Sequence, residues 1–200
     1  MKKVRRLLWA AVAIAGLGLF AAHRISATER TEKGNLGHVP SFSLLDQHGN
    51  PVTDQTLRGS VAVVNFIYTR CPSVCPMLTA KFKALQGKVG KLPGARFVSI
   101  SVDPEHDTPA VLKEYALRFQ AAPEWLFLTG PLATIEKTVV EGFKLHLGEA
   151  TPNGENPSLV DIMHGEHFVL VDKEGTIRGY YRSDAAGIEE LEDDLRALAR

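Results

Sequence analysis

The chain has 200 residues, 44% of them hydrophobic and 23% charged, which is enough apolar chain to bury the core of one domain with an appendage. Lysine and arginine together number 23, as do aspartate and glutamate, so the chain lacks the basic excess of most nucleic-acid-binding proteins and no nucleic-acid partner is expected. Its two cysteines are too few for the disulfide-dense scaffold of a small secreted protein.

Residues 1–26 are expected to form a separate unit. A basic start, MKKVRR, precedes the uncharged run Leu7–Ala22, and this order is typical of an export signal or a short membrane anchor. Because basic residues remain in the cytoplasm, residues 28–200 should lie outside the membrane. The sequence predicts a protein of the bacterial inner membrane with its domain in the periplasm, or a periplasmic protein if cleavage follows Ala27. Either location is oxidising.

A polar stretch with two glycines, residues 27–40, predicts a tether. The folded domain is then expected over residues 41–200. It should open with a hairpin around Gly49, because the short runs FSLLD and PVT flank the turn sequence QHGN.

The next segments predict a strand–helix–strand unit. The run Val61–Tyr68 is apolar on both faces and rich in β-branched residues, as a central buried strand should be. A helix should begin near Pro76, because proline fits the first helical position, and Ala95–Asp103 predicts the following strand. The loop after the first of these strands then lies at the strand's carboxyl end, where open α/β sheets bind ligands.

The rest of the chain alternates in the same way. Thr108 and Pro109 are typical of a helix start, as capping residue and first helical residue. A strand over Trp125–Gly130, a helix over residues 131–143, a hairpin of HFVLVD and TIRGYY, and a closing amphipathic helix follow. This order predicts an α/β fold, a three-layer sandwich whose central mixed sheet is flanked by helices, with an additional N-terminal hairpin.

The two cysteines, Cys71 and Cys75, lie in CPSVCP directly after the first central strand. Their spacing allows a disulfide, a redox pair, a metal site or two inert core residues. Zinc favours four ligands, whereas two thiolates suffice for Cu(I) and an added imidazole suits Cu(II). Because both thiols are expected near the positive end of the next helix, we expect the pKa of both to fall.

Three histidines are candidates for the added imidazole. His106 follows the second central strand, at the same edge of the sheet as the cysteines. His164 and His167 form an HxxH pair before a later strand, and period-two alternation places His167 on the face of Val169 and Val171. The residues alone leave the choice open.

Three stretches together resemble the Sco/SenC family, copper proteins of thioredoxin-like fold that help to assemble cytochrome c oxidase. They are NFIYTRCPSVCP (Asn65–Pro76), SVDPEHDTPAVLKEYA (Ser101–Ala116) and MHGEHFVLVDKEG (Met163–Gly175). The resemblance implies that copper, Cu(I) or Cu(II), is held by Cys71, Cys75 and His164. It implies that the two cysteines also form a redox disulfide, and that Asp103 orients or tunes the site from outside the ligand set.

The resemblance implies a copper chaperone that delivers or matures copper at the dinuclear copper site of cytochrome c oxidase. Its partners would be the subunit that holds this site, and other periplasmic copper carriers or thiol reductants. Such a protein is a carrier rather than a turnover enzyme. The alternative is a thiol-disulfide reductase that acts on the cysteines of that site or of another exported protein. A peroxidase-like enzyme and a copper or redox sensor also remain open.

Overall fold

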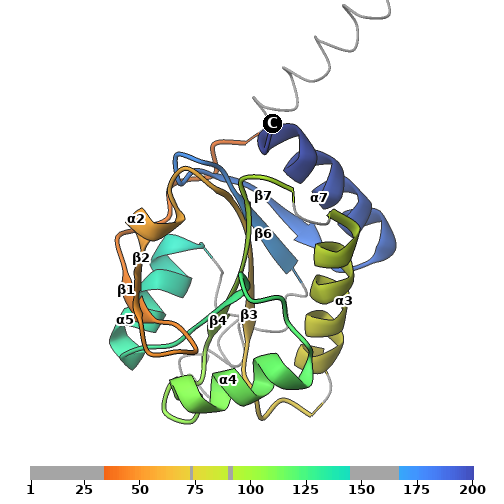
Figure 1. The fold of residues 1–200 in the computed structure, drawn as a ribbon. Coiled ribbons are helices and arrows are strands. Elements are labelled where there is room, and N and C mark those ends of the chain that lie inside the picture. The colour runs from red at the N-terminus through yellow and green to blue at the C-terminus, as the bar shows by residue number, and fades with distance from the viewer. Residues whose placement is uncertain (1–33, 73, 90–91, 145–166) are drawn as a thin grey trace, which may run out of the picture. The chain divides into compact units, whose positions relative to one another are not determined.

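The structure is a computed structural model that describes residues 34–72, 74–89, 92–144 and 167–200, drawn in Figure 1. These residues belong to one compact unit, Gly34–Arg200. No helix within the described ranges is long and apolar enough to cross a membrane. The expected anchor at residues 1–26 and the candidate ligand His164 lie outside these ranges.

The centre of the fold is a five-stranded mixed sheet with the strand order β5-β4-β3-β6-β7. β3, β4 and β5 run parallel, and β6 runs antiparallel to both β3 and β7. The strands are β3 (Val61–Ile67), β4 (Ala95–Ser101), β5 (Leu126–Leu128), β6 (His167–Val171) and β7 (Ile177–Arg182). All seven residues of β3 are buried, which confirms the predicted central strand.

Helices and a hairpin cover the two faces of this sheet (Figure 1). One face packs against α3 (Val74–Val89), α4 (Pro109–Arg118) and α7 (Ala185–Leu198). The other packs against the hairpin β1 (Ser43–Leu45) and β2 (Pro51–Thr53), the short α2 (Asp54–Leu57), and α5 (Leu132–Glu136) with its π-helical continuation η1 (Lys137–Gly142). The predicted three-layer α/β fold with an N-terminal hairpin is confirmed.

Side chains alternate between two hydrophobic clusters along β3. Val63 and Ile67 pack with Phe82 of α3, whereas Val64 packs on the opposite side with Phe143. A strand that contributes to two cores is fixed in register, because a slip of one residue would exchange all its side chains between the faces. The loop that follows β3 is therefore held at a fixed point on the edge of the sheet.

Residues 34–40, from the segment expected to form a tether, lie along the β6–β7 hairpin. The N–H groups of Leu36 and Val39 donate to the carbonyls of Ile177 and Gly175, at 3.1 and 2.9 Å. Val39 is buried, so these residues contribute to the core of the unit.

Candidate functional site

The cysteine loop, described over residues 69–72, lies between β3 and α3 at the carboxyl end of β3. Cys71 is 8% exposed and Cys75 is 1% exposed, and both are thiols rather than a disulfide. The Cys75 N–H donates to the Cys71 sulfur at 3.3 Å, and the two side chains are within hydrogen-bonding reach of each other. This geometry suits either the binding of one small soft cation or closure to a disulfide.

Helix α3 begins at Val74, two residues before the expected start near Pro76. Pro76 therefore lies in the first turn, where its missing N–H breaks no intrahelical bond. Cys75 becomes a buried residue of that turn, facing the core.

This burial overturns the expected fall in the pKa of Cys75. Removal of the thiol from water raises the pKa of Cys75 to about 12, and the neighbouring Cys71 adds to the rise, although a backbone hydrogen bond from Tyr68 opposes it. The helix end does not compensate for lost hydration. At neutral pH Cys75 is therefore a neutral thiol, and any cation that binds its sulfur must displace a proton.

Tyr68, the last residue before the cysteine loop, contacts both thiols. Its hydroxyl hydrogen bonds with the Cys71 side chain, and this bond, together with burial, raises the pKa of Tyr68 to about 12. The Cys71 N–H donates back to the Tyr68 carbonyl at 3.2 Å. Tyr68 therefore fixes the position of the Cys71 sulfur through its main chain and its side chain.

The loop after β4 supports the cysteine loop through Asp103. The Nε and one Nη of Arg70 donate to a single oxygen of Asp103, at 3.0 and 2.7 Å. Asp103 therefore affects Cys71 only indirectly, through Arg70, the residue that directly precedes Cys71.

A second carboxylate, Asp107, was not predicted and is completely buried beneath the same loop. It accepts hydrogen bonds from the N–H and hydroxyl of Thr69, at 3.1 and 2.5 Å, and from the Ser101 hydroxyl at 2.6 Å. The sequence signal was the second aspartate of DPEHDTP, which precedes the helix cap Thr108. A charged residue before a cap is usually solvated, so the pattern does not reveal this buried role.

The two candidate histidines within the described residues, His106 and His167, lie on different segments of the fold. His167 is half-buried at the start of β6. Because β6 is antiparallel to β3, with Val64 opposite Val169, the chain enters β6 at the edge of the sheet that carries the cysteine loop. His106 is exposed beyond β4, and its N–H donates to the Asp103 carbonyl at 3.1 Å. Among the described residues no three cysteine, histidine or acidic side chains form a cluster that could hold a metal ion.

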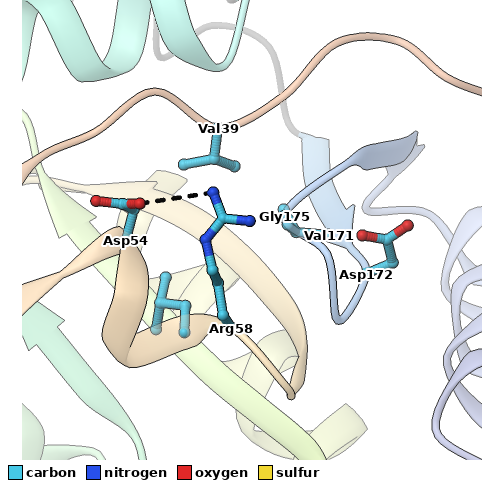
Figure 2. Close-up of a pocket in the computed structure, with 7 residues that line it drawn as sticks. Val39, Asp54, Arg58, Val171, Asp172 and Gly175 are labelled. Carbon is cyan, nitrogen blue, oxygen red and sulfur yellow. Dashed lines mark ion pairs between the residues drawn. The ribbon is translucent and has the colours of Figure 1, made fainter.

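A small pocket lies at the other end of the sheet, shown in Figure 2. Its volume is about 10 Å³, which is space for about one water molecule. Arg58 crosses it, 3.7 Å from Asp54, and donates to the Glu174 carbonyl at 2.8 Å. These contacts join α2 to the β6–β7 turn, so the pocket is part of the scaffold.

Comparison with known families identifies this arrangement. The SCO1/SenC family model matches residues 30–200. The chain belongs to the SCO1/SenC family. Its relatives include the SCO1 protein homolog of Bacillus subtilis, 34% identical over 165 residues that cover 80% of this chain and 82% of the relative.

Solved structures of the SCO1/SenC family share the fold. BsSco, a Sco-family cytochrome c oxidase assembly protein with an identified disulfide switch, matches with a TM-score of 0.69 and 30% identity, covering 84% of this chain and 96% of that one. ScoI of Bradyrhizobium japonicum, solved with copper bound, matches with a TM-score of 0.60 and 28% identity, covering 81% and 99%. The expected family and thioredoxin-like fold are both confirmed.

Proposed function

We propose that this protein is a copper chaperone that delivers or matures copper at the dinuclear copper site of cytochrome c oxidase. Cys71, Cys75 and His164 hold the ion, which is cargo rather than a resident cofactor. The observation that carries the proposal is the pair of adjacent buried thiols at the carboxyl end of β3. Copper is bound in a solved relative, ScoI of Bradyrhizobium japonicum, which agrees with this cargo.

The donor set fits copper on chemical grounds. Two thiolates are soft ligands that suit Cu(I), and an imidazole adds a ligand for Cu(II). The topology brings the chain into β6 at the edge of the cysteine loop, and His164 is three residues before β6 begins. The low exposure of both cysteines keeps a bound ion away from solvent thiols and oxidants.

A thiol-disulfide reductase is the second candidate, and the contact between the two thiols favours it. Cys71 and Cys75 are close enough for one to attack a mixed disulfide formed by the other. The disulfide switch identified in BsSco agrees with this chemistry. The substrate would be the cysteines of the oxidase copper site or of another exported protein.

We place the domain in the periplasm, tethered to the inner membrane by residues 1–26. The basic start and the apolar run Leu7–Ala22 support this location. Membrane fractionation at alkaline pH and N-terminal sequencing of the mature protein test it. Retention of Met1 in the membrane pellet agrees with an anchor, whereas a soluble periplasmic protein that begins after Ala27 requires cleavage.

The test of copper binding is a titration of the reduced full-length chain in detergent with Cu(II), followed by its visible spectrum. Wild type, His164→Ala and His167→Ala are compared, with His48→Ala as a control for an exposed histidine of the hairpin. We expect one equivalent of copper and a sulfur-to-copper charge-transfer band that only His164→Ala abolishes.

The other outcomes separate the candidates. Loss of the band only in His167→Ala reassigns the third ligand to His167. If copper merely oxidises Cys71 and Cys75 to a disulfide in wild type, the chaperone is wrong. The reduction potential of that disulfide then becomes the test of the reductase.

A further inference from the structure

A polar cleft of about 400 Å³ opens beside the cysteine loop. One wall is Thr69 and Arg70, which directly precede Cys71, and His106 contributes from the loop after β4. The other wall is α4, from which Glu114 and Arg118 face the cleft. Its volume lies within the range of sites that enclose a side chain or small ligand. A protein that docks on the cysteine loop would therefore also contact this cleft.

Arg118 is held in place without an anionic partner among the described residues. Its guanidinium carbon lies 4.9 Å from the centroid of the Tyr115 ring and 5.7 Å from that of Phe119, distances of cation–π contact. Across the described ranges, no hydrogen bond or ion pair involves the Arg118 guanidinium. Stacking restrains a planar group and leaves its N–H donors at the edge available to a ligand.

The support under Arg118 is rigid. Tyr115 is 2% exposed, and its hydroxyl hydrogen bonds with the Thr79 hydroxyl of α3 at 2.9 Å. The stacked arginine thus rests on a side chain that connects α4 to the helix carrying Cys75. A guanidinium held in this way loses little conformational entropy when it binds an anion.

The charge of the cleft favours an anion. Among the described residues that line it, Arg70 and Arg118 are the two arginines and Glu114 is the one carboxylate. Arg70 uses two of its five N–H donors on Asp103, so three remain. Two guanidinium groups on opposite walls are suited to one carboxylate, which accepts paired N–H donors.

We propose that this cleft binds an acidic side chain of the protein that docks on the cysteine loop, through Arg118 with help from Arg70. The carboxylate orients the docked protein so that its metal or thiol groups face Cys71 and Cys75. The identity of the docked protein as a copper acceptor rests on the proposed function, whereas the carboxylate site itself does not.

The experiment measures carboxylate binding without copper. The reduced, ¹⁵N-labelled full-length chain in detergent is titrated with a blocked peptide of two glutamates between glycines, and with its glutamine counterpart. Chemical shifts of the Arg118 Nε–H and of the Thr69 and His106 amides are followed at low and high salt. We expect the glutamate peptide alone to shift them, with an affinity that falls as salt increases.

Three variants assign the site. Arg118→Gln should weaken binding of the glutamate peptide about tenfold. Lys113→Gln, which removes the same charge from an exposed position of α4 that does not line the cleft, should change it less than twofold. Glu114→Gln should strengthen binding, because it removes the competing carboxylate, and a gain of affinity cannot come from misfolding.

The proposal is overturned if both peptides shift the same signals equally, or if Lys113→Gln weakens binding as much as Arg118→Gln does. Failure of the copper titration would not affect this result, because no copper is present. Conversely, a normal copper band in Arg118→Gln together with lost peptide binding separates docking from metal binding and supports the proposal.

Discussion

Arg70 and Asp103 join the two loops that lie at the carboxyl ends of β3 and β4, with nitrogen-to-oxygen distances of 3.0 and 2.7 Å. The Arg70 side chain is 62% exposed, so the pair contributes little to the free energy of unfolding. The position of Arg70 immediately before Cys71 is more important, because the Arg70–Asp103 pair fixes the direction of the main chain where it leads into Cys71.

Asp103→Asn should therefore affect copper binding more than stability. We expect a decrease of less than about 1 kcal/mol in the free energy of unfolding and a loss of roughly tenfold in copper affinity. Urea denaturation and competition with a copper chelator measure the two effects. Glu192→Gln, which removes the pairs of Glu192 with Arg196 and Lys88, should change neither by a comparable amount. Unchanged copper affinity in Asp103→Asn would remove this residue from the site.

Asp107→Asn should instead affect stability more than copper binding, because Asp107 is completely buried and accepts three hydrogen bonds, two of them short. In Asp107→Asn an amide N–H₂ must face at least one of the donors from Thr69 and Ser101. We expect a loss of about 2–4 kcal/mol in the free energy of unfolding, since bonds to charged groups are strong and unmet donors are costly. Denaturant unfolding checks this, with exposed Glu105→Gln as the control. A change as small as that of the control would be incompatible with a structural role.

The sequence predicted the elements that depend on local rules. Thr108 caps α4 by accepting from the Val111 N–H, and Pro109 is the first helical residue, as the pattern indicated. The strand predicted over Val61–Tyr68 is observed as Val61–Ile67, and the predicted placement of the cysteine loop at its carboxyl end is also correct. Each of these follows from a short window of chain or from the handedness of strand–helix–strand units.

The features that were not predicted depend on packing between distant segments. Asp107 is buried because Thr69, 38 positions away in the sequence, turns its donors toward it. The pKa of Cys75 is raised rather than lowered because the start of α3 faces the core. Neither burial is visible in the spacing of CPSVCP or DPEHDTP, since both require knowledge of which loops meet at the edge of the sheet.

Asp46, in the β1–β2 turn, should make the free energy of unfolding depend on pH in the acidic range. Burial alone would raise the pKa of Asp46, but hydrogen bonds from Asn50 and His48 outweigh it and lower the pKa below the ordinary value of 3.8. A group with a lowered pKa in the folded state contributes stability above its unfolded pKa, and loses it as the pH falls through the folded value. This contribution should therefore be complete at pH 6 and be lost progressively as the pH falls below about 4.

Asp46→Asn isolates that contribution. At pH 6 we expect the variant to be about 1–2 kcal/mol less stable than wild type, because the carboxylate accepts two backbone N–H groups and the Asn50 amide. The gap should narrow as the pH decreases from 4 to 2. Urea unfolding across this range measures it, and exposed Glu124→Gln should show no such convergence. A gap that stays constant with pH would mean that the charge of Asp46 is not involved.

A substitution of Tyr68 tests whether the residues around the two thiols affect copper affinity. Its hydroxyl bonds with the Cys71 side chain, so Tyr68→Phe removes one contact that orients this sulfur and leaves the ring in place. We expect the fold to be retained and copper affinity to fall about tenfold, as is common when a partner of a metal ligand is removed. Tyr180→Phe makes the same chemical change where the hydroxyl donates to the Phe143 carbonyl at 2.6 Å, on β7, and serves as the matched control. Chelator competition compares the two variants with wild type. Equal copper affinity in all three proteins would mean that the main-chain contacts of Cys71 alone position its sulfur.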